Sequence, residues 1–301
     1  MVSISASHAI LTQLADERRR VLSDWRAFIL LRRATLTISP RGRRWDKFPE
    51  SVAEVHPLLR RMVSRGEIKP IPGIRSIYEV TVPYANLAPL SEEEILMEAH
   101  PYAALGHISA LAFHGLTNEL SKDIVVIAPT GDVPGTNPPG TTSQDWIGLD
   151  VISGRRVKQI LGRQIRWINI KPTRYFGIGE YQPYGFTILV TTPERTLIDG
   201  IQSPELSGGL DNVLEAWVLA RDTLNVDILI HLVEQFDIKL LRQKVGFLLE
   251  ALEIDHATLD LWQSSAGRGG SSKLLASAPY SDIYSERWNL SINAPIDVLY
   301  R

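Results

Sequence analysis

The sequence predicts a mixed α/β fold of the α+β kind, in which an N-terminal winged helix-turn-helix precedes a larger α/β domain. Three observations support this prediction. A chain of 301 residues with 44% hydrophobic content is long enough for two domains. A basic helix followed by two extended runs lies before residue 82, and strand-like segments followed by helical ones lie after residue 91. Because VPYANLAPLS, residues 82 to 91, has the composition of a linker, we place the domains at 1–85 and 86–301.

Composition and hydropathy exclude several classes of protein. The chain has no cysteine, which excludes disulfides, thiolate zinc sites, iron–sulfur clusters and a cysteine nucleophile. It has no run of eighteen or more apolar residues, and its N-terminus lacks the basic start and apolar stretch of a signal peptide. We therefore expect a cytoplasmic protein that does not associate with a membrane.

Charge is distributed unevenly along the chain. The formal net charge is −2, but residues 17–75 contain fifteen Lys and Arg against six Asp and Glu, a local charge of 15 − 6 = +9. The remainder of the chain carries 17 − 28 = −11. An N-terminal basic block of this kind indicates nucleic-acid binding. The alternative is a solvated cationic surface without a partner.

The N-terminal segments follow one another in the order of a winged helix-turn-helix. Residues 8–33 have helix-forming composition, and ATLTIS, residues 34 to 39, alternates like a short strand. A basic helix begins near Pro57, which suits a first turn, and ends before Gly66, which suits the position just past a helix. The runs IKPI and IRSIYEVTV, joined around Pro72-Gly73, are typical of a hairpin.

The basic helix presents two different faces. Apolar residues share one face, namely Leu58, Leu59, Met62 and Val63. A helix fits the major groove of DNA and presents arginine to guanine edges, while a hairpin tip reaches neighbouring phosphates. The candidate DNA-binding residues lie in this helix, in the hairpin and in the basic segment before them: Arg41, Arg43, Arg44, Lys47, Arg60, Arg61, Ser64, Arg65, Lys69 and Arg75. The alternative is that the helix only packs a small domain and its arginines face water.

The C-terminal domain is predicted to mix strands and helices. EEEILMEA and GHISALAFHG have helical patterns, and the segment from Thr191 to about Asp260 is mostly helical. The expected strands are DIVVIA, WIGLDVI, QIRWINI and FTILV.

The stretch TTPERTLIDG, residues 191 to 200, has a structural explanation for each of its charges. The helix begins either with a Thr191–Glu194 capping box or with Thr192 as N-cap and proline at the first position. Glu194 lies in the first turn, where the helix dipole favours a carboxylate, and Arg195 lies four residues before Asp199, within reach across one turn. We expect a structural scaffold; a partner-binding patch and a catalytic site are the two alternatives.

The sequence predicts no catalytic residue, no metal site and no cofactor. His100, His107 and His114 recur every seven residues, but seven residues of helix rise about 10.5 Å, too far for two imidazoles to bind one ion. Walker A, dinucleotide-binding and H-E-x-x-H motifs are absent from the sequence.

Several ordered segments resemble the AbiEi family of antitoxins from type IV toxin–antitoxin systems. They are YAALGHISALAFHGLT at 102 to 117, IVVIAP at 124 to 129, TPERTLIDGIQSPELSGGLDNVLEAWVLA at 192 to 220, and the upstream basic helix and hairpin. The most specific parts are the S-A-L-x-x-H-G-L core, with Ser109 and His114, and the P-E-R-T-L-I-D segment, with Glu194, Arg195 and Asp199. The family often has a glycine just before the hairpin tyrosine, where this chain has Ser76 and Ile77 before Tyr78.

The resemblance implies a non-enzymatic antitoxin that represses its own operon. Its partners would be operator DNA with inverted repeats, bound by two protomers, and a cognate nucleotidyltransferase-like toxin that is counteracted without a stable complex. Two other functions stay open at this point: a winged-helix transcription factor that senses a ligand, and a nucleic-acid-modifying enzyme that draws on Glu194 or Asp199.

Overall fold

The computed structural model describes residues 3–84, 88–131, 133, 135–150, 152, 154–183, 185–265 and 272–300. The chain divides into two compact units. The N-terminal unit consists of Met1–Ala103, Pro129–Ile165 and Glu180–Leu189, and the C-terminal unit consists of Ala104–Ala128, Arg166–Gly179 and Val190–Arg301. The expected domain boundary between residues 85 and 86 lies outside the described residues.

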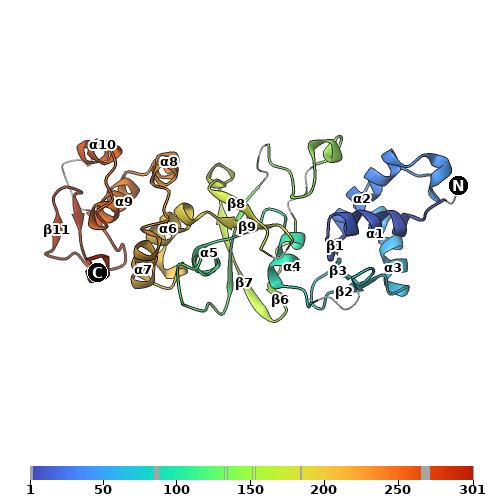
Figure 1. Cartoon of the computed structure of the whole chain (residues 1–301), viewed down its shortest axis with the longest axis horizontal. Coiled ribbons are helices and arrows are strands. Elements are labelled where there is room, and N and C mark those ends of the chain that lie inside the picture. The colour runs from blue at the N-terminus through green and yellow to red at the C-terminus, as the bar shows by residue number, and fades with distance from the viewer. Residues whose placement is uncertain are drawn as a thin grey trace. The chain divides into compact units, whose positions relative to one another are not determined.

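The N-terminal unit begins with three helices and a small sheet, seen in blue in Figure 1. The helices are α1 (Ala6–Asp16), α2 (Asp24–Thr37) and α3 (His56–Ser64), and the strands are β1 (Val21–Ser23), β2 (Ile68–Pro70) and β3 (Ile77–Val80). The strands form a sheet in the order β1-β3-β2, with both pairs antiparallel. The helices enclose an apolar core that includes Ile10, Leu14, Leu22, Ile29, Leu59 and Met62.

Two sequence-based expectations are wrong in this region. The helical region expected at residues 8–33 is interrupted by β1, and ATLTIS is not a strand, because α2 continues to Thr37. The hydroxyls of Thr35 and Thr37 donate to the carbonyls of Leu31 and Arg33, four residues earlier in the helix. This bonding accommodates threonine in a helix that is buried along most of its length.

Helix α3 begins and ends where its sequence predicts. Pro57 occupies the first turn, where its missing N–H has no helical partner to lose. Gly66 adopts φ +67° just past the helix, its N–H donates to the Val63 carbonyl at 3.0 Å, and the Glu67 N–H donates to the Met62 carbonyl at 3.0 Å. These two bonds form a Schellman motif, which satisfies the last helical carbonyls and turns the chain into β2.

The hairpin between β2 and β3 is also where the sequence predicts. Ile68 pairs with Val80 and Pro70 pairs with Tyr78, and Gly73 in the connecting turn has φ +76°. Ser76 has φ +58°, a left-handed conformation that glycine adopts at lower cost than serine.

A six-stranded sheet has the order β6-β7-β5-β4-β9-β8. Its strands are β4 (Ala104–Leu105), β5 (Ile124–Pro129), β6 (Gln159–Ile160), β7 (Arg163–Ile170), β8 (Ile178–Tyr181) and β9 (Ile188–Thr191). Strand β4 runs antiparallel to β5 and parallel to β9. The strand expected at WIGLDVI is wrong for the described part of that segment, because Trp146 ends a short 3-10 helix (Ser143–Trp146) and turns follow it; Val151 lies outside the described residues.

Helices dominate the rest of the described chain. Helix α4 (Glu92–Ala99) belongs to the N-terminal unit, whereas the C-terminal unit contains α5 (His107–Phe113), α6 (Pro193–Gln202), α7 (Leu210–Ala220), α8 (Val226–Phe236), α9 (Lys239–Ala251) and α10 (Thr258–Ser265). A last small sheet consists of β10 (Ser272–Lys273), β11 (Tyr284–Ser285) and β12 (Leu290–Ser291). The protein therefore mixes helices and sheets, and the predicted mixed α/β class is confirmed.

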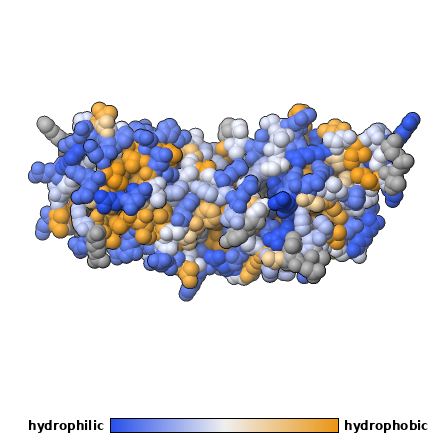
Figure 2. Space-filling model, viewed as in Figure 1, coloured by the Kyte–Doolittle hydropathy of each residue, from blue (hydrophilic) through white to orange (hydrophobic). Residues whose placement is uncertain are grey.

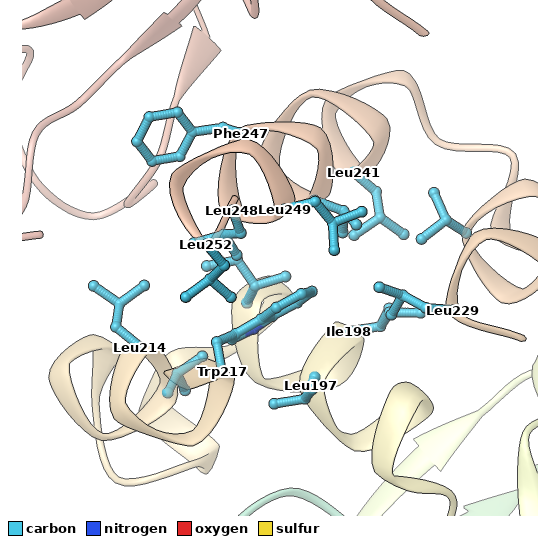
Figure 3. Close-up of a cluster of buried hydrophobic side chains, with 14 of the residues drawn as sticks. Leu197, Ile198, Leu214, Trp217, Leu229, Leu241, Phe247, Leu248, Leu249 and Leu252 are labelled. Carbon is cyan, nitrogen blue, oxygen red and sulfur yellow. The ribbon is translucent and has the colours of Figure 1, made fainter. Parts of the chain in front are cut away.

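The C-terminal unit has an extensive apolar core of its own. Trp217 of α7 is fully buried and lies among Leu197, Leu214 and Leu248 (Figure 3). Trp288 packs so closely on α9 that a Cβ atom built at Gly246 would lie 2.2 Å from its ring, so only glycine fits at this position.

On the face drawn in Figure 2, polar and hydrophobic residues are mixed, and hydrophobic residues gather in places over the C-terminal helices. Among the described residues, none of the helices combines the length and the apolar character that crossing a membrane requires.

Candidate nucleic-acid interface

The outer face of α3 is strongly cationic. Leu58, Leu59 and Met62 are buried on the inner face, whereas the outer side chains Arg60, Arg61 and Arg65 are exposed. Among the described residues, neither Arg60 nor Arg61 forms an ion pair, and Arg65 lies 3.9 Å from Glu67. Ser64 is exposed, but its hydroxyl donates to the Arg61 carbonyl at 2.8 Å. The helix therefore offers three guanidinium groups to solvent.

The hairpin carries two further cations. Lys69 of β2 and Arg75 of the turn are both exposed, and neither forms an ion pair with any residue that the structure describes. Helix α3 packs against β2, so the cations of the helix and of the hairpin belong to one substructure.

The four cations of the basic segment before α3 differ in how far they are available to a partner. Arg41 and Arg44 are exposed, and Lys47 is 73% exposed although it pairs with Glu54 at 3.0 Å. Arg43 differs, because its guanidinium donates to the Thr35 carbonyl and lies 5.9 Å from the centre of the Trp45 ring. The Arg43 side chain is thus committed to the fold.

One buried carboxylate, that of Asp24, connects α3 to the hairpin. Its Oδ2 atom accepts a hydrogen bond from Arg155 Nη2 at 2.6 Å and lies 3.4 Å from Nε2 of His56, the first residue of α3. The same guanidinium donates from Nη1 to the Arg75 carbonyl in the hairpin at 2.7 Å. Asp24 and Arg155 therefore fix the helix and the hairpin relative to each other.

The electrostatic surroundings of Tyr78 report the same arrangement. Burial raises the pKa of the Tyr78 hydroxyl above its ordinary value, and the charge of Asp24 adds to the rise. Arg155 and Arg60 oppose it. Tyr78 of β3 therefore lies close enough to Arg60 of α3 and to Arg155 to interact with their charges.

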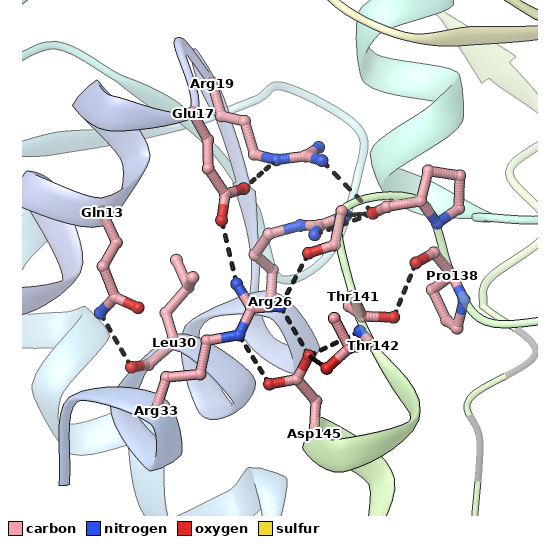
Figure 4. Close-up of polar contacts among 12 residues, drawn as sticks. Gln13, Glu17, Arg19, Arg26, Leu30, Arg33, Pro138, Thr141, Thr142 and Asp145 are labelled. Carbon is pink, nitrogen blue, oxygen red and sulfur yellow. Dashed lines mark hydrogen bonds and ion pairs between the residues drawn. The ribbon is translucent and has the colours of Figure 1, made fainter. Parts of the chain in front are cut away.

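Other arginines of the basic block face inward. Arg26, which is 2% exposed, donates from Nε to the Glu98 carboxylate at 2.9 Å, and Arg33 pairs with Asp145 at 2.6 Å. Figure 4 shows Arg26 and Arg33 beside Arg19, which pairs with Glu17 at 2.5 Å. The basic block thus contains two kinds of cation. Arginines such as Arg26 and Arg33 pair with carboxylates of the N-terminal unit, whereas Arg60, Arg61, Lys69 and Arg75 form no ion pair among the described residues.

The motif residues of α6 in the C-terminal unit form a buried structural network. Thr192 is the N-cap, since its side chain accepts from the Arg195 N–H at 3.3 Å, while Thr191 ends β9. Glu194 accepts from the Asn225 N–H at 3.2 Å, at the start of α8. Of the two expected registers, the one with Thr192 and Pro193 is therefore confirmed.

Arg195 is enclosed on every side. Its Nε donates to Asp199 Oδ1 at 2.8 Å, and its Nη1 donates to the carbonyls of Arg174 and Phe176 at 3.0 and 2.6 Å. The rings of Phe176 and Phe236 lie 5.0 and 4.7 Å from the guanidinium carbon. The Arg195 and Asp199 side chains are only 3% and 9% exposed, so both lie within the fold.

The two residues of the S-A-L-x-x-H-G-L segment also bond to backbone. Ser109 Oγ accepts from the Val125 N–H in β5 at 2.8 Å, and His114 Nε2 lies 2.7 Å from the Thr191 carbonyl. Burial lowers the pKa of His114, and the bond to Thr191 opposes that shift. Both residues therefore support the sheet.

A buried histidine that the sequence analysis did not single out as functional lies near this network. His107 has φ +51°, and its Nδ1 lies 3.3 Å from the hydroxyl of Ser207, which is fully buried. Burial lowers the pKa of His107, with Asp199 opposing. Because Ser207 has no exposed surface, this set does not form an accessible nucleophile.

Comparisons with known proteins concern the fold. No protein-family model matches the chain, and no curated protein matches it in sequence. The crystal structure of the RV2827C protein from Mycobacterium tuberculosis is similar to it with a TM-score of 0.51, over 98% of this chain and 93% of that chain, at 12% sequence identity. At that identity the likeness concerns the fold alone.

Proposed function

We propose that the protein is a DNA-binding autorepressor whose N-terminal winged helix-turn-helix recognises its operator through α3. The observation that carries this proposal is the outward row of Arg60, Arg61 and Arg65 on a helix that packs against a hairpin. Among the described residues Arg60 and Arg61 form no ion pair, and Arg65 lies 3.9 Å from Glu67. Helices α1, α2 and α3 followed by the β2–β3 hairpin have the element order of a winged helix. Arg26 and Arg33 of the same unit pair with carboxylates instead, so exposure distinguishes the α3 arginines from these two.

Each exposed group has a chemical role in this proposal. Arg60 and Arg61 would contact base edges in the major groove, because a guanidinium donates two hydrogen bonds to guanine. Lys69 and Arg75 would contact phosphates from the hairpin, and Arg41, Arg44 and Lys47 would add to the long-range attraction. Operator DNA with inverted repeats would hold two protomers, one on each half-site.

We propose further that the protein is a cytoplasmic, non-enzymatic antitoxin of the AbiEi kind, acting against a nucleotidyltransferase-like toxin without a stable complex. This part rests on the motif resemblance. The absence of an enzymatic role in this proposal is supported by the motif residues, whose side chains bond to backbone groups or to each other: Ser109, His114, Glu194, Arg195 and Asp199. Co-expression with a toxin-like protein encoded beside it tests this part: restored growth supports antitoxin function, and continued growth arrest with both proteins present contradicts it.

A ligand-sensing transcription factor is a second candidate, favoured by one observation. A cavity of about 280 Å³ lies beside the Asp24–Arg155 pair and is lined mainly by apolar groups, among them Trp25, Val52 and Ile77. A ligand there would act directly on the contact that fixes α3 to the hairpin. DNA release by a small molecule, together with the absence of a neighbouring toxin gene, would favour this candidate.

Replacing Arg60 or Arg61 with alanine is expected to weaken operator binding by about 1–3 kcal/mol for an arginine that contacts a base. Both side chains are exposed, so the thermal unfolding temperature should stay unchanged. Fluorescence anisotropy with the DNA upstream of the gene measures the effect. Arg221→Ala, which removes a 45% exposed arginine of the C-terminal unit, is the matched control, and unchanged affinity in both α3 variants would exclude α3 as the recognition helix.

A further inference from the structure

The remainder of the chain is acidic overall, but it contains a second cationic segment. Residues 151–179 contain seven Lys and Arg and no Asp or Glu, a charge of 7 − 0 = +7. The first four of these cations belong to the N-terminal unit: Arg155, Arg156, Lys158 and Arg163.

The structure holds the start of this segment against the hairpin. The Arg155 guanidinium bonds to the Arg75 carbonyl at 2.7 Å and to Asp24 at 2.6 Å, while the Arg155 N–H donates to the Ala99 carbonyl at 2.7 Å. Arg75 lies 80 positions earlier in the chain than Arg155. The contact therefore joins the late basic segment to the cationic hairpin of the proposed DNA interface.

Gly154 fixes the path of the backbone into this segment. It has φ +84°, and a Cβ atom built there would lie 2.6 Å from the Cα of His100 and 2.9 Å from the Ala99 carbonyl oxygen. Only glycine allows so close an approach to the end of α4. The position of the residues that follow is thus set by backbone contact.

Arg156 and Lys158, which follow Arg155 closely in the chain, are both exposed. Arg156 donates from Nη2 to the Pro129 carbonyl at 3.1 Å, which anchors its side chain. Lys158 forms no ion pair within the described part of the chain, and its own carbonyl accepts from the Ile165 N–H at 2.8 Å. The backbone of Lys158 is therefore held while its ammonium group faces solvent.

We propose that Arg156 and Lys158 form a second phosphate-binding patch, which extends the DNA interface from the hairpin onto the segment 154–158. This inference rests on the proposed DNA-binding function. Duplex DNA carries about one negative charge per 1.7 Å of axis, so a cationic surface that adjoins the hairpin meets further phosphates. Contacts to phosphate carry no sequence information, so the patch adds affinity for any duplex long enough to reach it.

The test is a salt titration of DNA binding by the full-length double variant Arg156→Gln, Lys158→Gln. Two duplexes of equal length are compared, one from upstream of the gene and one with that sequence scrambled. Because each lost phosphate contact lowers the slope of log K against log salt by about 0.9, we expect a slope smaller by about 2 on both duplexes. The affinity at about 0.1 M salt should fall at least roughly tenfold.

Controls separate this inference from the proposed function. Lys122→Gln with Lys239→Gln removes two exposed lysines of the C-terminal unit and should leave the slope unchanged. The single variant Lys158→Gln, which loses no ion pair seen among the described residues, should lower the slope by about 1. If the slope is unchanged in both the double and the single variant while Arg60→Ala weakens binding, the second patch is wrong and the proposed function stands. A loss confined to the upstream duplex also contradicts a phosphate contact, and absence of DNA binding by the unaltered protein overturns both proposals.

Discussion

Glu98→Leu is expected to lower the free energy of unfolding by about 3–5 kcal/mol, because it leaves the Arg26 guanidinium buried without its anion. The two side chains are 2% and 4% exposed, and their closest atoms lie 2.9 Å apart. Glu98 also accepts from the N–H and the hydroxyl of Ser23, at 3.0 and 2.6 Å. Burial lowers the pKa of Arg26, and the charge of Glu98 opposes this shift.

Urea denaturation of the variant measures this effect, and two controls sharpen it. Glu54→Leu makes the same chemical change in a pair whose lysine is 73% exposed and should cost less than about 1 kcal/mol. Arg26→Met combined with Glu98→Leu removes both charges, so it should recover most of the loss. A cost below 1 kcal/mol for Glu98→Leu alone would mean that Arg26 finds water or another acceptor.

Arg195→Met is expected to destabilise the protein by a similar amount, about 3–5 kcal/mol, because it leaves the Asp199 carboxylate buried and uncompensated. Asp199 Oδ2 has no hydrogen-bond partner among the described residues, so Arg195 is the group that balances its charge. The substitution also removes the guanidinium from between the rings of Phe176 and Phe236.

Asp199→Asn is the informative companion to Arg195→Met. In this variant Arg195 keeps the carbonyls of Arg174 and Phe176 and both rings, so the loss should be smaller than that of Arg195→Met. Thermal and urea unfolding of both variants check this order. An exposed pair would cost less than about 1 kcal/mol in either variant, and such a result would contradict the buried network.

Local signals explain which elements could be predicted from sequence. The leucine stripe, Pro57 and Gly66 define α3, because a cap and a helical period are properties of neighbouring residues. Strand β1 was not predictable in this way, since its three residues carry no period and form a strand only by pairing with β3, more than fifty residues later. The strand predicted at ATLTIS was wrong because burial along α2 outweighs the strand preference of β-branched residues.

The candidate interface was predictable only in part. Exposure of Arg60, Arg61 and Arg65 follows from the amphipathic pattern of their own helix. The inward pairing of Arg26 and Arg33 does not, because their partners Glu98 and Asp145 lie 72 and 112 positions away. The role of Arg155 was not predictable for the same reason, although residues 151–179 contain seven Lys and Arg and no acidic residue.

The central claim, sequence-specific DNA binding through α3, is tested most directly by competition. The full chain is bound to a labelled duplex from upstream of its gene and displaced with unlabelled upstream or scrambled DNA, at a series of salt concentrations. We expect the upstream duplex to compete at least about a thousandfold better, with a steep salt dependence, and Arg60→Ala with Arg61→Ala to remove most of that preference. Equal competition by the two duplexes, or a preference that survives loss of both arginines, would contradict the account.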